Sequence, residues 1–184
     1  TNINKMCVAA FGMLAQQKDG YPLLLCDMTW LTAIRTAATA ALVTEYAMPV
    51  NHKNSLGIIG SGAQSEFMLH ALSQVFPVEV CYFTDIVLVT LTAAKKQIDL
   101  VDFNWLKPGS LICGVGGDTP GKTEFSADFT KRCKIVVEYL EQTKIEGEIQ
   151  NIDDYKNIIS IYELITGLKQ VRVDDKDIVL FDSV

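Results

Sequence analysis

Two apolar runs near the start of the chain, residues 6–16 and 21–26, flank the polar turn 17–20. The turn contains an Asp-Gly pair, and apolar runs joined in this way predict a β-hairpin. Between residues 30 and 47, apolar side chains recur at helical spacing at Leu31, Ile34, Ala38, Ala41, Leu42 and Tyr46. This periodicity predicts an amphipathic helix with Thr29 as its N-cap.

Short apolar runs alternate with helix-like segments along the rest of the chain. The pattern predicts buried strands at residues 56–59, 78–83, 86–91, 110–115, 134–138 and 178–181. It predicts helical segments at residues 103–106, 126–132 and 155–168, together with a helix through Phe67 that Pro77 closes. Strands that alternate with helices are typical of an α/β domain with a parallel sheet.

The strands at 78–83 and 86–91 are separated by Thr84 and Asp85 alone. Two parallel strands need a crossover of about a dozen residues or more. One very long strand is an alternative, but the strand-helix-strand pattern elsewhere favours residues missing near 84–86.

A glycine-rich turn follows the predicted strand 56–59. Its sequence, Gly60-x-Gly62-x-x-Ser65, resembles the dinucleotide-binding fingerprint, whose glycines allow a tight turn and a close approach to a pyrophosphate. The helix that follows would direct free N–H groups and its positive dipole end at phosphate. An ordinary glycine turn is the alternative.

An acidic residue at the end of the second strand of such a unit binds the ribose hydroxyls. Asp85 lies 25 residues after Gly60, and no Lys or Arg follows it closely. We therefore predict Asp85 as a ribose ligand and NAD rather than NADP as the cofactor. A strand-end carboxylate in water is the alternative.

The loop 115–124 follows a predicted strand at the edge where open α/β sheets bind ligands. It places Asp118, Lys122 and Glu124 among three glycines, which allow a ligand to approach the backbone closely. A carboxylate in this setting can exchange protons with a bound amine. A solvated turn would have the same composition.

Arg35 flanks the apolar face of the predicted helix 30–47, among small neighbours. The space around its guanidinium would allow it to bind a carboxylate with two parallel hydrogen bonds. The alternative is an Arg stem that lies along the edge of the core.

Composition narrows the classes of function. A formal net charge of −6 without basic runs argues against nucleic acid and anionic membranes as partners. No apolar stretch approaches the roughly 18 residues of a membrane span. The five cysteines are not closely spaced, and no Cys/His spacing is typical of a metal site. We therefore expect a cytoplasmic protein with reduced thiols and no metal ion.

Several segments together resemble the ornithine cyclodeaminase/mu-crystallin family, and the resemblance covers nearly the whole chain. These segments are residues 31–38, 60–64, 86–92, 107–109, 114–124 and 181–184. The stretch Val-Gly-Gly-Asp-Thr-Pro-Gly-Lys-Thr-Glu at 115–124 is most similar to the ornithine cyclodeaminases, rather than to the mu-crystallin or imine reductase branches.

The resemblance implies a Rossmann-type NAD-binding domain, part of a β-rich substrate and dimerisation domain, and a homodimer. We predict part of the substrate domain at residues 1–28 and the NAD-binding domain at 29–150. Residues 151–184 would form a helix and a strand that return to the substrate domain. The family's catalytic lysine and a further carboxylate-binding arginine belong to a stretch that we expect before Thr1.

The resemblance also implies roles for individual residues. Asp118 would be the catalytic acid/base and would contact the substrate, as would Arg35 and Val184. The residues implied to contact the cofactor are Arg35, Gly60, Gly62, Ala63, Gln64, Asp85, Thr92, Val115, Gly116, Gly117, Lys122 and Ser183. One departure is Cys7, which stands where a cofactor-contacting Thr is usual.

The implied reaction converts L-ornithine to L-proline and ammonia. NAD⁺ takes a hydride from the α-carbon and later returns it, so the reaction has no net redox change. A cyclic ketimine reductase or an amino-acid dehydrogenase of the same family is one alternative, and a non-catalytic dinucleotide-binding protein is another. The sequence leaves ornithine, lysine and other diamino acids open as substrates.

Overall fold

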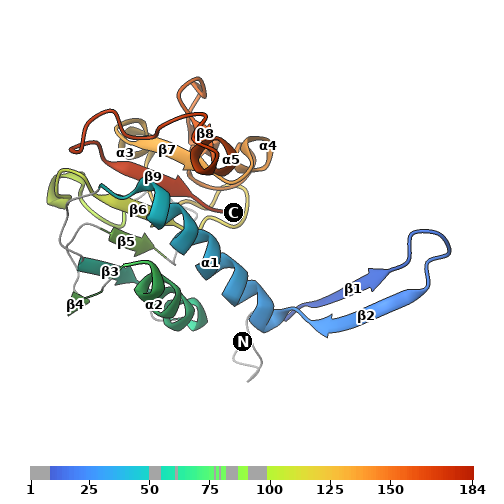
Figure 1. The fold of residues 1–184 in the computed structure, drawn as a ribbon. Helices are drawn as coiled ribbons and strands as arrows, with labels where there is room; N and C mark the ends of the chain where they lie inside the picture. Colours follow the sequence, from blue (N-terminus) through green and yellow to red (C-terminus); the bar gives the residue numbers. More distant parts are fainter. Residues whose placement is uncertain are drawn as a thin grey trace.

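A seven-stranded sheet forms the centre of the computed structural model, which describes residues 9–49, 55–60, 62–76, 78, 80–81, 87–90 and 99–184. Neighbouring strands are parallel throughout, in the order β4-β3-β5-β6-β9-β7-β8 (Figure 1). The strands are β3 (Ser55–Ile59), β4 (Val80–Cys81), β5 (Val87–Thr90), β6 (Leu111–Gly114), β7 (Lys134–Val137), β8 (Ile159–Ser160) and β9 (Val179–Asp182). The predicted α/β fold with a parallel sheet is confirmed.

Side chains at alternate strand positions pack into separate layers on the two faces of the sheet. Cys113 and Phe181 belong to the layer that includes α1 and α2, whereas Ile112 and Leu180 pack with Phe129 on the other face. The helices are α1 (Thr29–Ala47), α2 (Ala63–Val75), α3 (Ala127–Lys131), α4 (Leu140–Thr143) and α5 (Ile161–Ile165), with short 3-10 turns η1 (Phe103–Trp105) and η2 (Glu148–Asn151).

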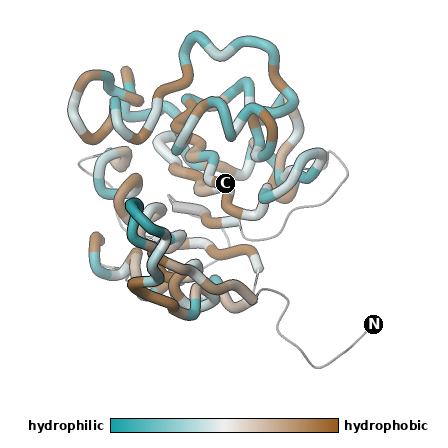
Figure 2. Tube along the Cα trace, turned by 90° about the vertical axis from the view of Figure 1, so that its right-hand side faces the viewer, coloured by the Kyte–Doolittle hydropathy of each residue, from teal (hydrophilic) through white to brown (hydrophobic). Residues whose placement is uncertain are grey.

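The predicted hairpin is confirmed, with β1 (Phe11–Ala15) antiparallel to β2 (Pro22–Asp27). It projects from the amino-terminal end of α1, away from the main sheet (Figure 1). Figure 2 shows hydrophobic residues along its strands and a polar turn at its tip. A two-stranded ribbon is at best marginally stable alone. Its exposed apolar side chains therefore indicate a surface that packs against further protein.

The prediction that Thr29 is the N-cap of α1 is wrong. Met28 holds that position without a capping hydrogen bond from its side chain. The Asp27 carboxylate instead accepts hydrogen bonds from the backbone N–H groups of Thr29 (3.0 Å) and Trp30 (3.4 Å). The Thr29 hydroxyl accepts from the backbone N–H of Ala10, so this side chain connects the helix to the hairpin.

The buried face of α1 also differs from the predicted one. Leu31, Ile34 and Leu42 are exposed, and so are Ala38 and Tyr46. The buried residues are small: Ala33, Thr36, Ala37, Ala40, Ala41, Val43, Thr44 and Ala47. The spacing between packed helices depends on the side chains at the contact. Small residues therefore turn inward where α1 packs closely on the sheet and α2, and the larger ones face outward.

Both strands around the suspected break are present, as β4 and β5. β4 and β5 lie on opposite sides of β3 and pair with it in parallel. The last residue of β4, Cys81, and the first residue of β5, Val87, both pair with Leu56. β4 therefore ends at the level along the sheet where β5 begins. The connecting residues 82–86 lie outside the described residues.

Residues 155–168 do not form the single helix that their spacing predicts. Ile159 joins the sheet beside β7, where it pairs with Val136. Helix α5 begins only after this strand, and Ser160 and Glu163 form a capping box at its start. Apolar residues occur in this segment both because β8 is buried in the sheet and because α5 packs against it, so their spacing imitated one continuous helix.

The last two strands lie in the second half of the main sheet. Both β8 and β9 belong to the main sheet, and β9 lies between β6 and β7. Residues 151–184 therefore contribute two strands to this sheet. Within the described part of the chain, no helix has the length and apolar character to cross a membrane.

Candidate functional site

The carboxyl ends of four neighbouring strands meet at one edge of the sheet. Ile59, Thr90, Gly114 and Asp182 pair in register across β3, β5, β6 and β9. The segments that follow these strands therefore start side by side. This edge brings together most of the residues predicted for the site, and it is where parallel α/β sheets bind ligands. Those residues are Gly60, Gly62, Ala63, Gln64, Val115, Gly116, Gly117, Asp118, Lys122, Ser183 and Val184.

The turn after β3 leaves room for a phosphate group. Gly60 has a φ of 109°, a conformation that favours glycine. Among the described residues, a Cβ on Gly62 would meet no atom within 4 Å, and no side chain caps the start of α2. Gln64 Oε1 is buried and has no hydrogen-bond partner among the described residues. The open start of α2, where backbone N–H groups can donate hydrogen bonds, fits the pyrophosphate of a dinucleotide.

The loop 115–124 presents an ion pair at the same edge. Lys122 Nζ donates to Asp118 Oδ1 at 2.7 Å. The Asp118 side chain is 65% exposed and the Lys122 side chain 32% exposed. The carboxylate can therefore be reached by a ligand, and it lies beside a positive charge. This geometry allows Asp118 to take up or release a proton at the surface of the loop.

Arg35 is exposed in the amino-terminal half of α1. The ring of Trp30, at the start of α1, lies 5.8 Å from that of Phe67 near the start of α2. At the other end of α1, the Ala47 carbonyl accepts a hydrogen bond from Arg172, which also binds two carbonyl groups before β6. Helix α1 therefore begins on the side of the sheet that carries the candidate site.

Two further residues predicted for the site, Asp85 and Thr92, lie outside the described residues.

Three buried carboxylates lie at the end of the loop and beneath it, and the sequence analysis gave none of them a role in the site. Glu124, Glu148 and Asp182 are each at most 1% exposed. Thr90 Oγ1 donates to Glu124 Oε2 at 2.6 Å, and one Asp182 oxygen, Oδ1, is buried with no partner among the described residues. A signal was present in the sequence, since Asp182 directly follows the apolar run Val179–Phe181. No group of three His, Cys, Asp or Glu residues in the described ranges is arranged to hold a metal ion.

Burial raises the pKa values of two of these carboxyl groups. The pKa of Glu148 rises to about 8 and that of Asp182 to about 7. Desolvation is the main cause, and the negative charge of Glu124 adds to it in both cases. Hydrogen bonds from backbone N–H groups act in the opposite direction, because they favour the ionised form.

These two groups predict that the protein loses stability as the pH rises from about 4 to about 8. Their ordinary pKa values are 4.5 and 3.8, so in this range the unfolded chain releases protons that the folded protein keeps. The free energy of unfolding should fall by up to about 1.4 kcal/mol per pH unit for each such proton. Urea unfolding between pH 5 and 8 measures this slope. Asp182→Asn should reduce the slope, and a wild-type stability that rises with pH would contradict the prediction.

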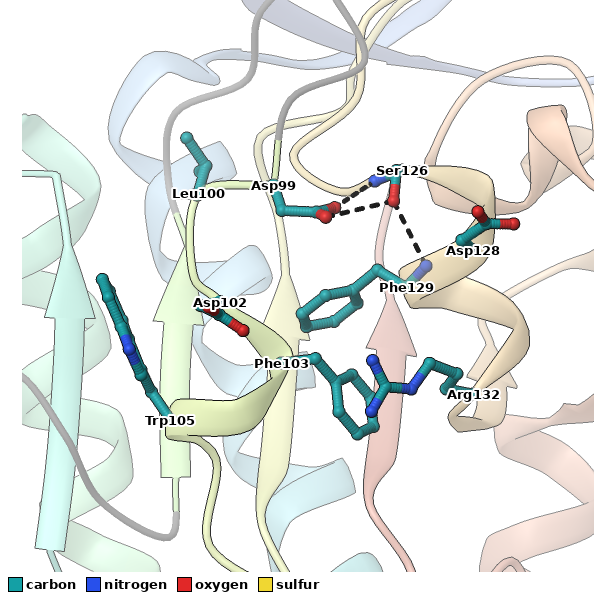
Figure 3. Close-up of a pocket in the computed structure, with 9 residues that line it drawn as sticks. All are labelled: Asp99, Leu100, Asp102, Phe103, Trp105, Ser126, Asp128, Phe129 and Arg132. Carbon is teal, nitrogen blue, oxygen red and sulfur yellow. Dashed lines mark hydrogen bonds between the residues drawn. The ribbon is translucent and has the colours of Figure 1, made fainter.

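A pocket on another part of the surface contains none of these carboxylates. It has a volume of about 550 Å³ and is lined by Asp99, Leu100, Asp102, Phe103, Trp105, Ser126, Asp128, Phe129 and Arg132 (Figure 3). The Arg132 guanidinium lies 3.5 Å from the centre of the Phe103 ring, and Asp99 accepts hydrogen bonds from Ser126. None of the predicted site residues lines it, so we attribute these contacts to the packing of η1 against α3.

Comparison with known proteins identifies the family. The sequence profile of the ornithine cyclodeaminase/mu-crystallin family matches residues 4–86 and 82–184. The chain belongs to this family. The two matched parts share residues 82–86, which is the position of the suspected break. Asp85 lies within this shared stretch.

Two curated members of the ornithine cyclodeaminase/mu-crystallin family are clearly similar to this chain. The ornithine cyclodeaminase of Agrobacterium tumefaciens (strain Ach5) is 37% identical over 217 residues, covering 100% of this chain and 61% of the relative. The alanine dehydrogenase of Archaeoglobus fulgidus is 33% identical, covering 96% of this chain and 65% of the relative. The chain thus spans less than two thirds of the length of these relatives.

A solved structure of an alanine dehydrogenase has the same fold as this chain. An archaeal alanine dehydrogenase dimer with bound NAD superposes with a TM-score of 0.88 and 29% sequence identity, over 99% of this chain and 68% of that one. The alignment with the Agrobacterium relative extends over 217 residues, whereas this chain has 184. The alignment therefore contains positions of the relative that have no counterpart in this chain.

Proposed function

We propose that this chain forms the NAD-binding part of an ornithine cyclodeaminase, which converts L-ornithine to L-proline and ammonia. The observation that carries the proposal is the Asp118–Lys122 pair, on a glycine-rich loop at the edge where the open turn before α2 also lies. The identity of 37% with an ornithine cyclodeaminase over the whole chain supports the same conclusion.

The cofactor would lie along the carboxyl edge of the sheet. We propose that Gly60, Gly62, Ala63 and Gln64 surround its pyrophosphate, because the start of α2 offers free N–H groups and space. Further contacts are proposed for Arg35, Asp85, Thr92, Val115, Gly116, Gly117, Lys122 and Ser183. Bound NAD would accept a hydride from the substrate α-carbon and return it to the cyclic imine, so that it acts catalytically.

The residues of this chain would hold the substrate and move its protons. Asp118 would exchange protons with the amino groups, which must lose and gain protons as one amine attacks and ammonia leaves. Lys122 Nζ, which donates a hydrogen bond to Asp118 Oδ1 at 2.7 Å, would hold this carboxylate in its orientation. Arg35 would bind the substrate carboxylate, and Val184 would contact the substrate beside it.

We also propose a homodimer. Large apolar side chains are exposed on the hairpin, among them Phe11 at 76% and Leu25 at 68%. Leu31 and Ile34 extend this surface along α1. Patches of this kind mark contact sites between proteins. The archaeal alanine dehydrogenase with 29% identity is itself a dimer.

Two other functions remain as alternatives. An amino-acid dehydrogenase, or a reductase of cyclic imines, would use the same edge of the sheet, and the identity of 33% with an alanine dehydrogenase favours this class. Such an enzyme would consume its nicotinamide cofactor stoichiometrically. A non-catalytic dinucleotide-binding protein would bind the cofactor without turnover.

The test uses protein expressed from the complete gene, given L-ornithine and a trace of NAD. Proline and ammonia should form in equal amounts, and their total should exceed the amount of NAD many times. The proposal is wrong if proline does not appear while a cyclic imine is reduced at the expense of NADH. L-lysine and 2,4-diaminobutyrate, supplied under the same conditions, would define the chain length that the site accepts.

A further inference from the structure

A short segment after α4 holds the candidate catalytic loop in place. Gln150 Oε1 accepts a hydrogen bond from the Gly121 backbone N–H at 2.6 Å. The Gln150 side-chain amide donates to the Lys122 carbonyl at 3.2 Å and to the Gly147 carbonyl. One side chain therefore binds the backbone on both sides of the Gly121–Lys122 peptide. It also connects that peptide to the start of η2.

Glu148 acts on the end of the same loop. Its two carboxylate oxygens accept hydrogen bonds from the backbone N–H groups of Glu124 (2.8 Å) and Phe125 (2.9 Å). Glu148 is only 1% exposed, so water does not compete for these hydrogen bonds. Together, Gln150 and Glu148 bind four backbone groups of residues 121–125.

This segment is in turn fixed to the central sheet. Asp182, the last residue of β9, accepts hydrogen bonds from the backbone N–H groups of Glu148 (2.8 Å) and Ile149 (2.9 Å). The loop and the segment also approach closely, since a Cβ on Gly117 would lie 3.2 Å from the Gly147 Cα. A rigid series of contacts thus joins β9, the start of η2 and the loop.

We propose that Gln150 and Glu148 are positioning residues, which hold the loop 115–125 so that Asp118 and Lys122 face the bound substrate and cofactor. This inference rests on the proposed function for its catalytic consequence. Neither side chain is assigned a contact with the reacting atoms. Their effect is to fix the backbone on both sides of the ion pair, since small errors in the placement of a catalytic group lower the rate strongly.

Gln150→Ala is the principal test, and Gln142→Ala is its matched control. Gln142 also donates a side-chain hydrogen bond, to Glu146 Oε1 at 2.9 Å, but that bond lies within 142–146 and does not reach the loop. We expect Gln150→Ala to lower kcat for proline formation at least fivefold, with KM values for ornithine and NAD within threefold of wild type. Gln142→Ala should leave kcat within twofold. A smaller loss of kcat in Gln150→Ala, or an equal loss in Gln142→Ala, overturns the proposal.

Amide hydrogen exchange tests the contacts without relying on activity. Exchange of the Gly121 amide should accelerate at least tenfold in Gln150→Ala and stay unchanged in Gln142→Ala. In Glu148→Gln, one of the two acceptor oxygens is replaced by an NH₂ group. The amide of Glu124 or Phe125 should then exchange faster, and Glu146→Gln serves as its control. Unchanged exchange in both loop variants overturns the proposal.

The two proposals fail in distinguishable ways. If the wild-type protein forms no proline, the proposed function is wrong, and amide exchange alone decides whether the segment holds the loop. If Gln150→Ala does not fold, Gln150→Glu replaces it. The carboxylate of that variant keeps an acceptor for Gly121 and loses the donor to the Lys122 carbonyl, so we expect a loss of kcat of at least threefold. A kcat within twofold of wild type in that variant overturns the inference.

Discussion

Replacing Asp118 by Asn should reduce the rate of proline formation at least a hundredfold, while the dissociation constant for NAD stays within about threefold of wild type. A positioned acid/base group contributes roughly 10²–10⁴ to a rate. Asn has nearly the same shape as Asp, and its carbonyl oxygen can still accept the hydrogen bond that Lys122 Nζ donates to Asp118 Oδ1. The substitution therefore preserves the loop and removes only the capacity to exchange a proton.

The control for this substitution is Asp153→Asn. Asp153 is exposed like Asp118, but it lies between η2 and β8, away from the loop 115–124. Its replacement makes the same change of charge, so a general effect of net charge on the enzyme would appear in both variants. Steady-state kinetics give kcat and KM, and fluorescence titration gives the affinity for NAD. Equal rates in Asp118→Asn and wild type would exclude Asp118 as the acid/base.

The same substitution separates the alternatives. A cyclodeaminase loses turnover and keeps cofactor binding. A dinucleotide-binding protein without activity has no turnover to lose, and its affinity for NAD is the only quantity that can change. If the protein is a reductase or a dehydrogenase, the wild type forms no proline from ornithine. Asp118→Asn would then lower the rate at which NADH or NAD⁺ is consumed.

Elements defined by local patterns were predictable from the sequence. The hairpin, the turn at Gly60 and the strands of the sheet other than β8 each depend on residues that are neighbours along the chain. The buried face of α1 was not predictable in this way. Whether the small or the large apolar residues of α1 are buried depends on how closely the sheet and α2 approach this helix. Leu31 and Leu42 were therefore assigned to the core, although the folded chain leaves them exposed.

The candidate site was predictable only in part, and for a similar reason. Asp118 and Lys122 are four residues apart, so a local motif contains the ion pair. Glu148 and Gln150 act on backbone groups 23 to 29 residues away, and Asp182 acts on groups 33 and 34 residues away. Such contacts exist only after the sheet has brought these segments together. No periodicity or local motif in one sequence encodes them.

These long-range contacts decide whether the glycine-rich loop 115–124 is a mobile turn or a fixed one. A glycine-rich loop with a carboxylate could be a mobile, solvated turn, because glycines add conformational freedom. In this protein, Gly117 instead allows close packing against Gly147, and polar side chains bind the loop backbone. These hydrogen bonds bind the loop backbone at several points, and a well-placed catalytic group favours efficient proton transfer.

Gly147→Ala should destabilise the protein by about 3 kcal/mol, which is the largest stability effect that we expect from a single added methyl group. Gly147 has a φ of 89°, and an added Cβ would lie 2.6 Å from Asp182 Oδ1 and 2.7 Å from Val184 Cγ1. These distances are shorter than van der Waals contact. The carboxylate of Asp182 also binds the start of η2, so it cannot move away without breaking those hydrogen bonds.

Gly167→Ala is the control that isolates the contribution of the backbone. Gly167 has a similar φ of 71°, but an added Cβ there would meet no atom within 4 Å. This variant should lose only about 1 kcal/mol, the cost of placing an L-residue in the left-handed region. Urea unfolding of both variants measures the difference, which reports the steric conflict at the candidate site. Equal losses would show that Asp182 and Val184 can yield, and that the contact between Gly147 and the end of β9 is not rigid.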